Sequence, residues 1–282
     1  MVKIISDSTC DLSKELLNRY DIDIIPLHII LGEQEYLDGK NITPDEIYKW
    51  SDENRTTPKT SAPSIEDTID TMNKYLSQGM EIVCFTISSE MSTSMNVMKL
   101  AAQELDAEDK VFVIDSRNLS TGIGLLVIEA AIMAKANLSA SQIANSINEL
   151  IPSVRSSFVV DTLEYLYRGG RCSGLAALAG GVLKLHPQII VNKGIMSAAK
   201  KYRGKMKQVI LDYTKDLERA LLTAKKERVF ITHSGCDKEI IDSVYKYLED
   251  LNHFDEILIT QAGGVISSHC GYGTLGVLFI EM

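Results

Sequence analysis

The sequence predicts an α/β fold built as two lobes with mostly parallel sheets. Short apolar runs rich in β-branched residues alternate with longer segments of helical periodicity along the 282 residues, as in proteins whose parallel strands are joined by helices. Pro152 interrupts this pattern near the middle, and each half has an alternation of its own. We therefore expect an N-terminal lobe over residues 1–152 and a C-terminal lobe over 153–282, with ligands in the cleft between them.

The N-terminal half predicts four strands and six helices. The expected strands are 2–6, 22–31, 82–87 and 111–115. The expected helices start near Asp11, at Pro44 behind an N-cap at Thr43, and at Ser64, and then cover 92–105, 119–136 and 139–150. Serine and threonine accept the free N–H groups of a first helical turn, and proline tolerates the first helical position. Segment 119–136 is apolar almost all round, which predicts a buried helix.

The C-terminal half predicts a second set of alternating elements. The expected strands are 157–160, 188–191, 195–197, 228–233, 257–260 and 275–281, and the expected helices are 163–167, 175–185, 205–225 and 238–250. Asn192-Lys193-Gly194 between two of the strands is typical of a β-hairpin turn. Ordinary core packing explains most residues of the apolar helices 119–136 and 175–185.

Composition excludes several classes of function. The chain has 29 Lys and Arg against 38 Asp and Glu, a net charge of −9, which repels nucleic acid and anionic membranes. Its five cysteines are widely spread without a C-x-x-C pair, so neither a disulfide scaffold nor a zinc site is expected. No apolar run reaches the ~18 residues of a membrane span, and the first residues lack the apolar stretch of a signal peptide. We expect a cytoplasmic protein without stable membrane insertion.

The most obvious motif is a glycine-rich segment near the C-terminus. Gly271-Tyr272-Gly273-Thr274-Leu275-Gly276 fits G-x-G-x-x-G. A dinucleotide site needs this turn to open a helix, whereas residues 277–282 are typical of a strand. We therefore expect a glycine turn and no bound nucleotide, and neither a P-loop nor a G-x-S-x-G nucleophile elbow is present.

Two loops are unusually rich in hydroxyl side chains. They are residues 56–64 and residues 88–94, and each leads into an expected helix. Hydroxyls at helix N-termini hydrogen-bond anions such as a carboxylate or a phosphate, but such residues are more often ordinary N-caps. Capping and anion binding both remain open for these loops.

Acidic, basic and imidazole groups offer further chemistry. Asp7 and Asp115 each end an expected strand, and His269 precedes the glycine-rich turn, so each could serve as a general base. Turn formation and helix capping are the favoured explanation of the two aspartates. Basic residues gather at 168–171 and 200–205, where they indicate either an acidic ligand or a solvated face.

Taken together and in order, several motifs resemble those of the DegV family. They are Asp7-Ser8-Thr9-Cys10-Asp11-Leu12, Thr60-Ser61-Ala62-Pro63-Ser64, Ile87-Ser88-Ser89-Glu90-Met91-Ser92, Asp115-Ser116 with Gly122 and Gly124, Tyr165-Leu166-Tyr167-Arg168-Gly169-Gly170-Arg171, and His269-Cys270-Gly271-Tyr272-Gly273-Thr274. The resemblance runs nearly from end to end of the chain. Six motifs in the right order and spacing are specific, although no single one of them is.

The resemblance implies a protein that binds a long-chain fatty acid such as palmitate or oleate. Its acyl chain would be buried in a tunnel, with the carboxylate held between two α/β lobes. By position in the motifs, Thr60 and Ser92 are the expected carboxylate ligands, and Ser61, Ser94, His269 and Arg171 are further contributors. The resemblance also implies a role in lipid transport or fatty acid metabolism, with no cofactor or catalytic residue and with a separate kinase subunit as a partner that phosphorylates the acid.

One departure from the family pattern and two other functions remain open. Thr93-Ser94-Met95 stands where the family has Gly-Thr-Tyr, which adds a β-branched side chain beside the head group. A hydrolase or phosphotransferase would use Asp7, Asp115 or His269 as its base. A regulatory module would dock a protein partner through the basic cluster around Arg203.

Overall fold

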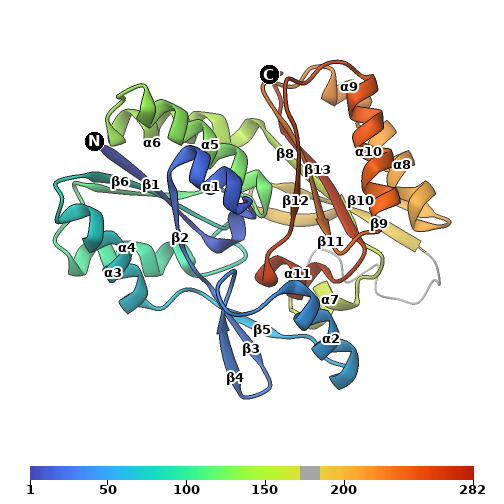
Figure 1. Cartoon of the computed structure of the whole chain (residues 1–282), viewed down its shortest axis with the longest axis horizontal. Coiled ribbons are helices and arrows are strands. Elements are labelled where there is room, and N and C mark those ends of the chain that lie inside the picture. Colours follow the sequence, from blue (N-terminus) through green and yellow to red (C-terminus); the bar gives the residue numbers. More distant parts are fainter. Residues whose placement is uncertain (172–184) are drawn as a thin grey trace.

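The computed structural model describes residues 1–171 and 185–282, and it confirms the predicted α/β class. The described chain forms three sheets. Figure 1 shows the sheet of the N-terminal half on the left, the sheet of the C-terminal half on the right, and a small third sheet below them. This arrangement places residues from both halves around the centre of the molecule.

The N-terminal half contains a parallel sheet with helices on both faces. Its order is β2-β1-β6-β7, from β1 (Val2–Asp7), β2 (Ile22–Ile25), β6 (Glu81–Thr86) and β7 (Val111–Asp115). The flanking helices are α1 (Lys14–Tyr20), α3 (Ile65–Leu76), α4 (Ser94–Glu104), α5 (Thr121–Lys135) and α6 (Ala140–Leu150). Side chains alternate across the sheet: Ile4 packs with α5 and α6, while Ile5 packs with α3 and α4.

The predicted helix starts of this half are largely confirmed. Thr43 forms a capping box with Glu46 at the start of α2 (Pro44–Asn54). The Ser64 side chain accepts the Asp67 N–H, and Ser139 forms a capping box at the start of α6. These hydroxyls satisfy N–H groups that would otherwise lack partners.

The expected strand 22–31 is two strands that belong to different sheets. Pro26 lies between β2 and β3 (His28–Leu31), and it has no N–H to continue a ladder. The third sheet has the order β4-β3-β5, formed by β3 with β4 (Gln34–Leu37) and β5 (Lys59–Ser61). Within it, Ile29 pairs with Thr60, which places one of the hydroxyl loops on this small sheet.

The sheet of the C-terminal half departs from the prediction of mostly parallel sheets. Its order is β10-β9-β8-β13-β11-β12, from β8 (Val154–Val159), β9 (Leu185–Asn192), β10 (Ile195–Arg203), β11 (Val229–Ser234), β12 (Ile257–Gln261) and β13 (Thr274–Ile280). Only β11 and β12 pair in parallel. The predicted hairpin is confirmed, and it explains part of the difference, because a two-residue turn can join only antiparallel strands.

The helices of the C-terminal half differ from expectation at two places. The helices of this half are α7 (Glu164–Arg168), α8 (Met206–Asp216), α9 (Glu218–Leu221), α10 (Lys238–Asp250) and α11 (Gly264–Cys270). The expected helix 205–225 is two helices, α8 and α9, and α11 was not predicted. The expected helix 175–185 lies outside the described residues except for Leu185, which begins β9.

Helix α5 joins the two halves into one core. It contacts β1 and β6 of the parallel sheet as well as β8 and β13 of the other sheet. One apolar cluster accordingly contains Ile4 and Phe85 from the first half together with Phe158, Phe230 and Leu278 from the second. The division into lobes at residue 152 stays a prediction.

The apolar helix α5 contains a single acidic residue, Glu129. Glu129 receives ion pairs from Arg228, at the start of β11, and from Lys225 at 2.9 Å. The side chains of Glu129 and Arg228 are 12% and 8% exposed, so this pair lies in the interior between the two halves. Together with the buried hydrogen bond of Thr121 to Thr232 at 2.6 Å, this ion pair links α5 to the second half.

No helix among residues 1–171 and 185–282 is long and apolar enough to cross a membrane. In the same part of the chain, no three His, Cys, Asp or Glu side chains lie together as metal ligands would.

Candidate functional site

A cavity of about 470 Å³ lies where the two halves meet the small third sheet. Its walls come from the loop after β6, from β5, from the start of α5, from α7 and the loop after it, from β10 and from α11. The residues that line it are Leu27, Thr60, Ser61, Ala62, Ile87, Ser89, Glu90, Met91, Ser92, Thr93, Leu119, Leu166, Arg171, Met196, Val265, Ile266, His269 and Cys270. The volume is within the usual range for small-molecule sites.

One part of the wall is polar and holds five of the six predicted head-group residues. Thr60, Ser61, Ser92, Arg171 and His269 all line this cavity, although they come from four separate segments. Ser61 is exposed, and so are its neighbours on the wall Ser89, Glu90 and Thr93. These exposed residues mark the side on which the cavity opens to solvent.

Thr60 and His269 contact one another across the cavity wall. The Thr60 Oγ1 and the His269 Nε2 are 2.8 Å apart. Burial, and next the positive charge of Arg171, lower the pKa of His269 to about 4, so the imidazole is neutral at pH 7. A Cβ added to Gly169 would lie 2.2 Å from the His269 Nδ1, which shows how closely α7 and the imidazole pack.

Arg171 places a cation at the same wall. Its guanidinium donates to the carbonyl oxygens of Gly169 at 2.7 Å and Met91 at 3.3 Å. Among the described residues no carboxylate forms an ion pair with it, and burial alone lowers its pKa. A half-buried arginine without an acidic partner favours an anion beside it.

The loop of residues 88–93 before α4, called the serine loop below, carries Ser92, and the Ser92 side chain contacts Ser94 at the start of α4. The Ser92 Oγ lies 2.9 Å from the Ser94 Oγ and accepts the Ser94 N–H at 3.3 Å. Ser94 is fully buried and does not line the cavity, unlike the neighbouring Thr93, and Met95 is also absent from the lining. The Ser92 hydroxyl therefore accepts a backbone N–H and lines the cavity at once, whereas Thr93, the N-cap of α4, makes no side-chain cap hydrogen bond.

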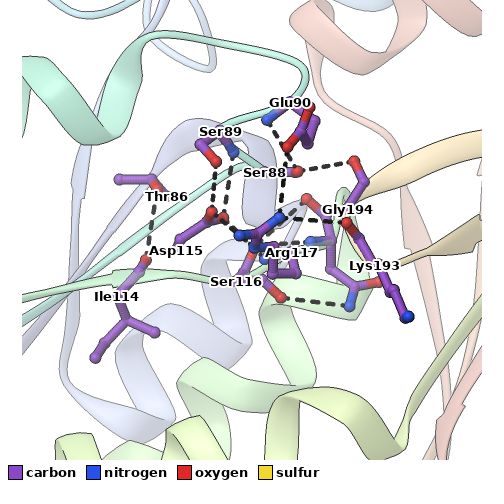
Figure 2. Close-up of polar contacts among 11 residues, drawn as sticks. Thr86, Ser88, Ser89, Glu90, Ile114, Asp115, Ser116, Arg117, Lys193 and Gly194 are labelled. Carbon is purple, nitrogen blue, oxygen red and sulfur yellow. Dashed lines mark hydrogen bonds and ion pairs between the residues drawn. The ribbon is translucent and has the colours of Figure 1, made fainter.

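A polar network holds this serine loop in place (Figure 2). The Asp115 carboxylate accepts hydrogen bonds from the Ser89 N–H at 3.2 Å, the Ser89 Oγ at 2.6 Å and the Arg117 N–H at 3.0 Å. The Arg117 guanidinium pairs with Asp115 at 3.2 Å and with Glu90 at 3.5 Å. Ser89 and Glu90 are thereby fixed at the rim of the cavity.

The rest of the cavity wall is apolar. The apolar side chains are Leu27, Ile87, Met91, Leu119, Leu166, Met196, Val265 and Ile266. Leu119, Ile266 and Cys270 also line an adjoining crevice of about 20 Å³, which reaches Phe158 and Leu278 of the second sheet. The cavity therefore has a hydroxyl-rich cationic part and an apolar part that continues toward the interior.

Neither of the two candidate aspartate bases lines the cavity, although each accepts a hydrogen bond from a residue that does. Asp7 is fully buried, and it accepts the Thr9 N–H at 3.1 Å and the Ile87 N–H at 2.8 Å. Burial raises its pKa to about 6. Asp115 makes the loop contacts just described, so both carboxylates act here as hydrogen-bond acceptors for backbone segments.

Sequence reasoning missed most of the apolar wall. Val265 and Ile266 lie on α11, which no periodicity indicated, and Met196 follows the hairpin turn. The alternation of strand 195–197 could have pointed Met196 to one face of the sheet. For α11 the signal was weak, because Gly263-Gly264 is more typical of a turn than of a helix start.

The whole chain matches one protein-family model. Residues 1–282 match the model of the DegV family, which is described as a family of uncharacterised proteins. A DegV domain-containing protein of Clostridium acetobutylicum is 33% identical over 282 residues, which cover 99% of this chain and 98% of the relative. A DegV domain-containing protein of Clostridium perfringens is also 33% identical, over 281 residues with the same shares.

Solved structures from three bacteria are similar over the full length. A fatty-acid-binding DegV family protein from Thermus thermophilus has a TM-score of 0.91 at 29% identity, and the match covers 100% of this chain and 99% of the Thermus chain. A stearic-acid-binding protein from Eubacterium ventriosum has a TM-score of 0.86 at 33% identity, covering 100% and 98%. A Thermotoga maritima protein described as revealing fatty acid binding has a TM-score of 0.83 at 28% identity, covering 100% and 99%.

Proposed function

This chain belongs to the DegV family, and on that premise we propose that it binds a long-chain fatty acid such as palmitate or oleate. The observation that carries the proposal is the mixed lining of one cavity. Hydroxyls and an arginine without an acidic partner in the described chain line it together with many aliphatic side chains. The ligands named for the similar solved structures support the same class of molecule.

In this proposal the carboxylate lies against Thr60, Ser61, Ser92 and Arg171. The neutral His269 carries its proton on Nε2 and donates it to the Thr60 Oγ1, which leaves the Thr60 proton for the carboxylate. The His269 Nδ1 is buried without a partner among the described residues, in agreement with an unprotonated nitrogen packed against Gly169. Ser94 supports Ser92 from behind.

The acyl chain supplies most of the affinity in this arrangement. Burying about 14 methylenes at ~0.8 kcal/mol each gives a gross gain of about 11 kcal/mol, from which association costs are subtracted. A hydrogen bond to a charged group adds only about 1.5–3 kcal/mol. The hydroxyls therefore serve mainly to fix which end of the lipid faces the opening.

The proposed role is transport or presentation of the acid in the cytoplasm, without chemistry by this chain and without a cofactor. The exposed rim at Ser61, Ser89, Glu90 and Thr93 leaves the carboxylate end accessible to a separate kinase subunit. If instead the isolated chain turned over acyl phosphate or phosphate esters steadily, and His269→Ala abolished that turnover, the hydrolase or phosphotransferase alternative would hold.

The first test is direct identification of the ligand. Mass spectrometry of an organic extract of the purified protein should show a long-chain acid at near-stoichiometric amount. Absence of such an acid, together with no uptake of added palmitate or oleate, contradicts the proposal.

The second test concerns the head-group residues. Thr60→Val and Ser92→Ala should each weaken palmitate binding about 10- to 100-fold, because each removes one hydrogen bond to a charged group. Isothermal titration measures the affinity, and Ser77→Ala, an exposed serine on the C-terminal side of α3, is the matched control. Unchanged affinity in both variants would show that the carboxylate lies elsewhere in the cavity.

A further inference from the structure

The turn between β9 and β10 lies against the serine loop of the other half (Figure 2). Lys193 and Gly194 form the turn, and both have positive φ, 50° and 84°, as a two-residue type I′ turn requires. The Ser88 Oγ donates to the Gly194 carbonyl at 2.8 Å, and the Arg117 Nη1 donates to the Lys193 carbonyl at 3.4 Å. Two side chains of the N-terminal half therefore hold consecutive carbonyls of one turn.

The Ser88 contact is buried and closely fitted. Ser88 is 0% exposed, and Gly194 is also buried. A Cβ added to Gly194 would lie 2.5 Å from the Ser88 Oγ, so only glycine allows this approach. Without the Ser88 hydroxyl, the Gly194 carbonyl would have no donor from this side, which is unfavourable for a buried polar group.

The same two side chains also shape the loop that lines the cavity. The Ser88 Oγ accepts the Glu90 N–H at 3.3 Å, and the Ser88 carbonyl accepts the N–H groups of Met91 at 2.9 Å and Ser92 at 3.1 Å. Arg117 holds Glu90 and shares Asp115 with Ser89. The turn and the loop that carries Ser92 are thus joined through Ser88 and Arg117.

The contact lies where the two walls of the cavity meet. Met91 comes from the serine loop, Met196 follows the turn by two residues, and both line the cavity and pack in one apolar cluster. Ser88 and Arg117 do not line the cavity themselves. They join its two walls from outside, beside the exposed rim at Ser89 and Glu90.

We propose that Ser88 and Arg117 are positioning residues that clamp the β9–β10 turn onto the serine loop and thereby set the rate at which a bound acid enters and leaves the cavity. This inference rests on the proposed binding of a fatty acid. In this proposal the long hydrocarbon passes between the walls at Met91 and Met196, and the clamp opposes their separation. Because the clamp touches no ligand atom, it acts equally on the empty and the loaded protein.

This mechanism has a kinetic signature that a contact with the ligand lacks. If ligand passes only through the open form, weakening the clamp raises the open population with and without ligand, so both rate constants rise together. The equilibrium constant then changes little. A residue that merely stabilises the fold or touches the ligand would raise the dissociation rate and weaken the affinity by a matching factor.

The experiment measures association and release of cis-parinaric acid, a fluorescent long-chain acid, by stopped flow. Ser88→Ala and Arg117→Gln should each raise kon and koff about tenfold, with Kd changed less than about threefold. Arg155→Gln is the matched control, since Arg155 is an arginine paired with Glu281 at the far end of β8 and β13, and it should leave both rates unchanged.

The other possible results distinguish failure of the clamp from failure of the proposed fatty acid binding. A rise in koff alone with an equal loss of affinity, or unchanged rates in both variants, overturns the clamp while wild-type binding stands. If the wild-type protein itself binds no acid, the proposed function fails instead. Should Ser88→Ala not fold, as judged by circular dichroism, the exposed Arg117→Gln variant provides the test alone.

Discussion

The imidazole of His269 differs from an ordinary surface histidine in its titration. Burial and the nearby charge of Arg171 lower its pKa to about 4, against an ordinary value of 6.5. Between these two pH values the unfolded chain binds a proton at this residue and the folded chain does not. By linkage, the contribution of this residue to the free energy of unfolding rises with pH between the folded pKa of about 4 and the unfolded pKa of 6.5, and it is fully present above pH 6.5.

We therefore predict that His269→Gln removes part of the acid sensitivity of the protein. Between pH 7 and pH 4.5 the wild type should lose about 2–3 kcal/mol more stability than the variant, at ~1.36 kcal/mol per pKa unit. Urea unfolding at the two pH values measures the difference. Asp7 acts with the opposite sign, since its pKa is raised to about 6, but it is common to both proteins and cancels. Equal losses in the two proteins would contradict the prediction.

At the same scale, the sequence could predict residue types at the site better than their partners. Thr60, Ser61, Ser92, Arg171 and His269 line one cavity as the motif resemblance implied. The contact of Thr60 with His269 could not be predicted, because it joins β5 of the small sheet to α11, about 200 residues later, and no local pattern encodes their relative position. Asp115 was considered a general base, and its actual neighbours Ser89 and Arg117 come from loops whose conformation depends on tertiary contacts.

Among the elements, α11 shows how a short helix is placed by residues distant in sequence. The Gly263 N–H donates to Asp11 at 2.8 Å and the Gly264 N–H donates to Asp38 at 2.7 Å. Both carboxylates are buried, at 6% and 2% exposed. They satisfy the free N–H groups at the start of a helix that has no side-chain cap of its own.

We predict that Asp38→Ala destabilises the protein by about 3 kcal/mol and weakens palmitate binding. The change leaves the Gly264 N–H and the Ser8 hydroxyl without their acceptor, at about 1–3 kcal/mol for each buried group. Binding weakens because α11 carries part of the cavity wall. Urea unfolding and titration calorimetry measure the two effects.

The control for this prediction is Asp70→Ala, which removes an exposed carboxylate on α3 and should change stability by less than about 0.5 kcal/mol. If Asp38→Ala matched that control in both measurements, α11 would be held by its apolar contacts alone.

The predicted elements were most accurate where periodicity and capping agree. The parallel strands and the starts of α2, α3 and α6 follow from local sequence. The break between α8 and α9 does not follow from local sequence, because Leu217 continues the helical pattern in sequence while the chain turns there. Strand direction in the C-terminal sheet depends on which strands meet, and Thr274–Ile280 pairs antiparallel with both of its neighbours.

On the scale of the whole molecule, both halves share one core around α5. Its residues are buried against the parallel sheet on one side and against β8 and β13 on the other. A fragment of residues 1–152 would therefore expose an apolar face of α5 to water. The lobes are expected to be parts of one cooperative unit, as the single family match over residues 1–282 also suggests.

We accordingly predict that residues 1–152 and 153–282, produced as separate chains, fold only when combined. Each alone should show a weak, non-cooperative thermal transition by circular dichroism, and the mixture should regain a cooperative transition and palmitate binding. A control chain cut within the exposed turn near Gly79, away from the shared core, should tolerate the cut better. Cooperative folding of the isolated fragment 1–152 would establish independent domains instead.

The carboxylate of Glu129 has a consequence for this shared helix. A helix that is apolar on every side has no intrinsic preference for one rotation about its axis or one position along it. Because Glu129 meets Arg228 and Lys225 in a single setting, sliding α5 by one turn would strand a charge in hydrocarbon surroundings. The acidic side chain, together with the Thr121–Thr232 hydrogen bond, thus favours one alignment of the two sheets.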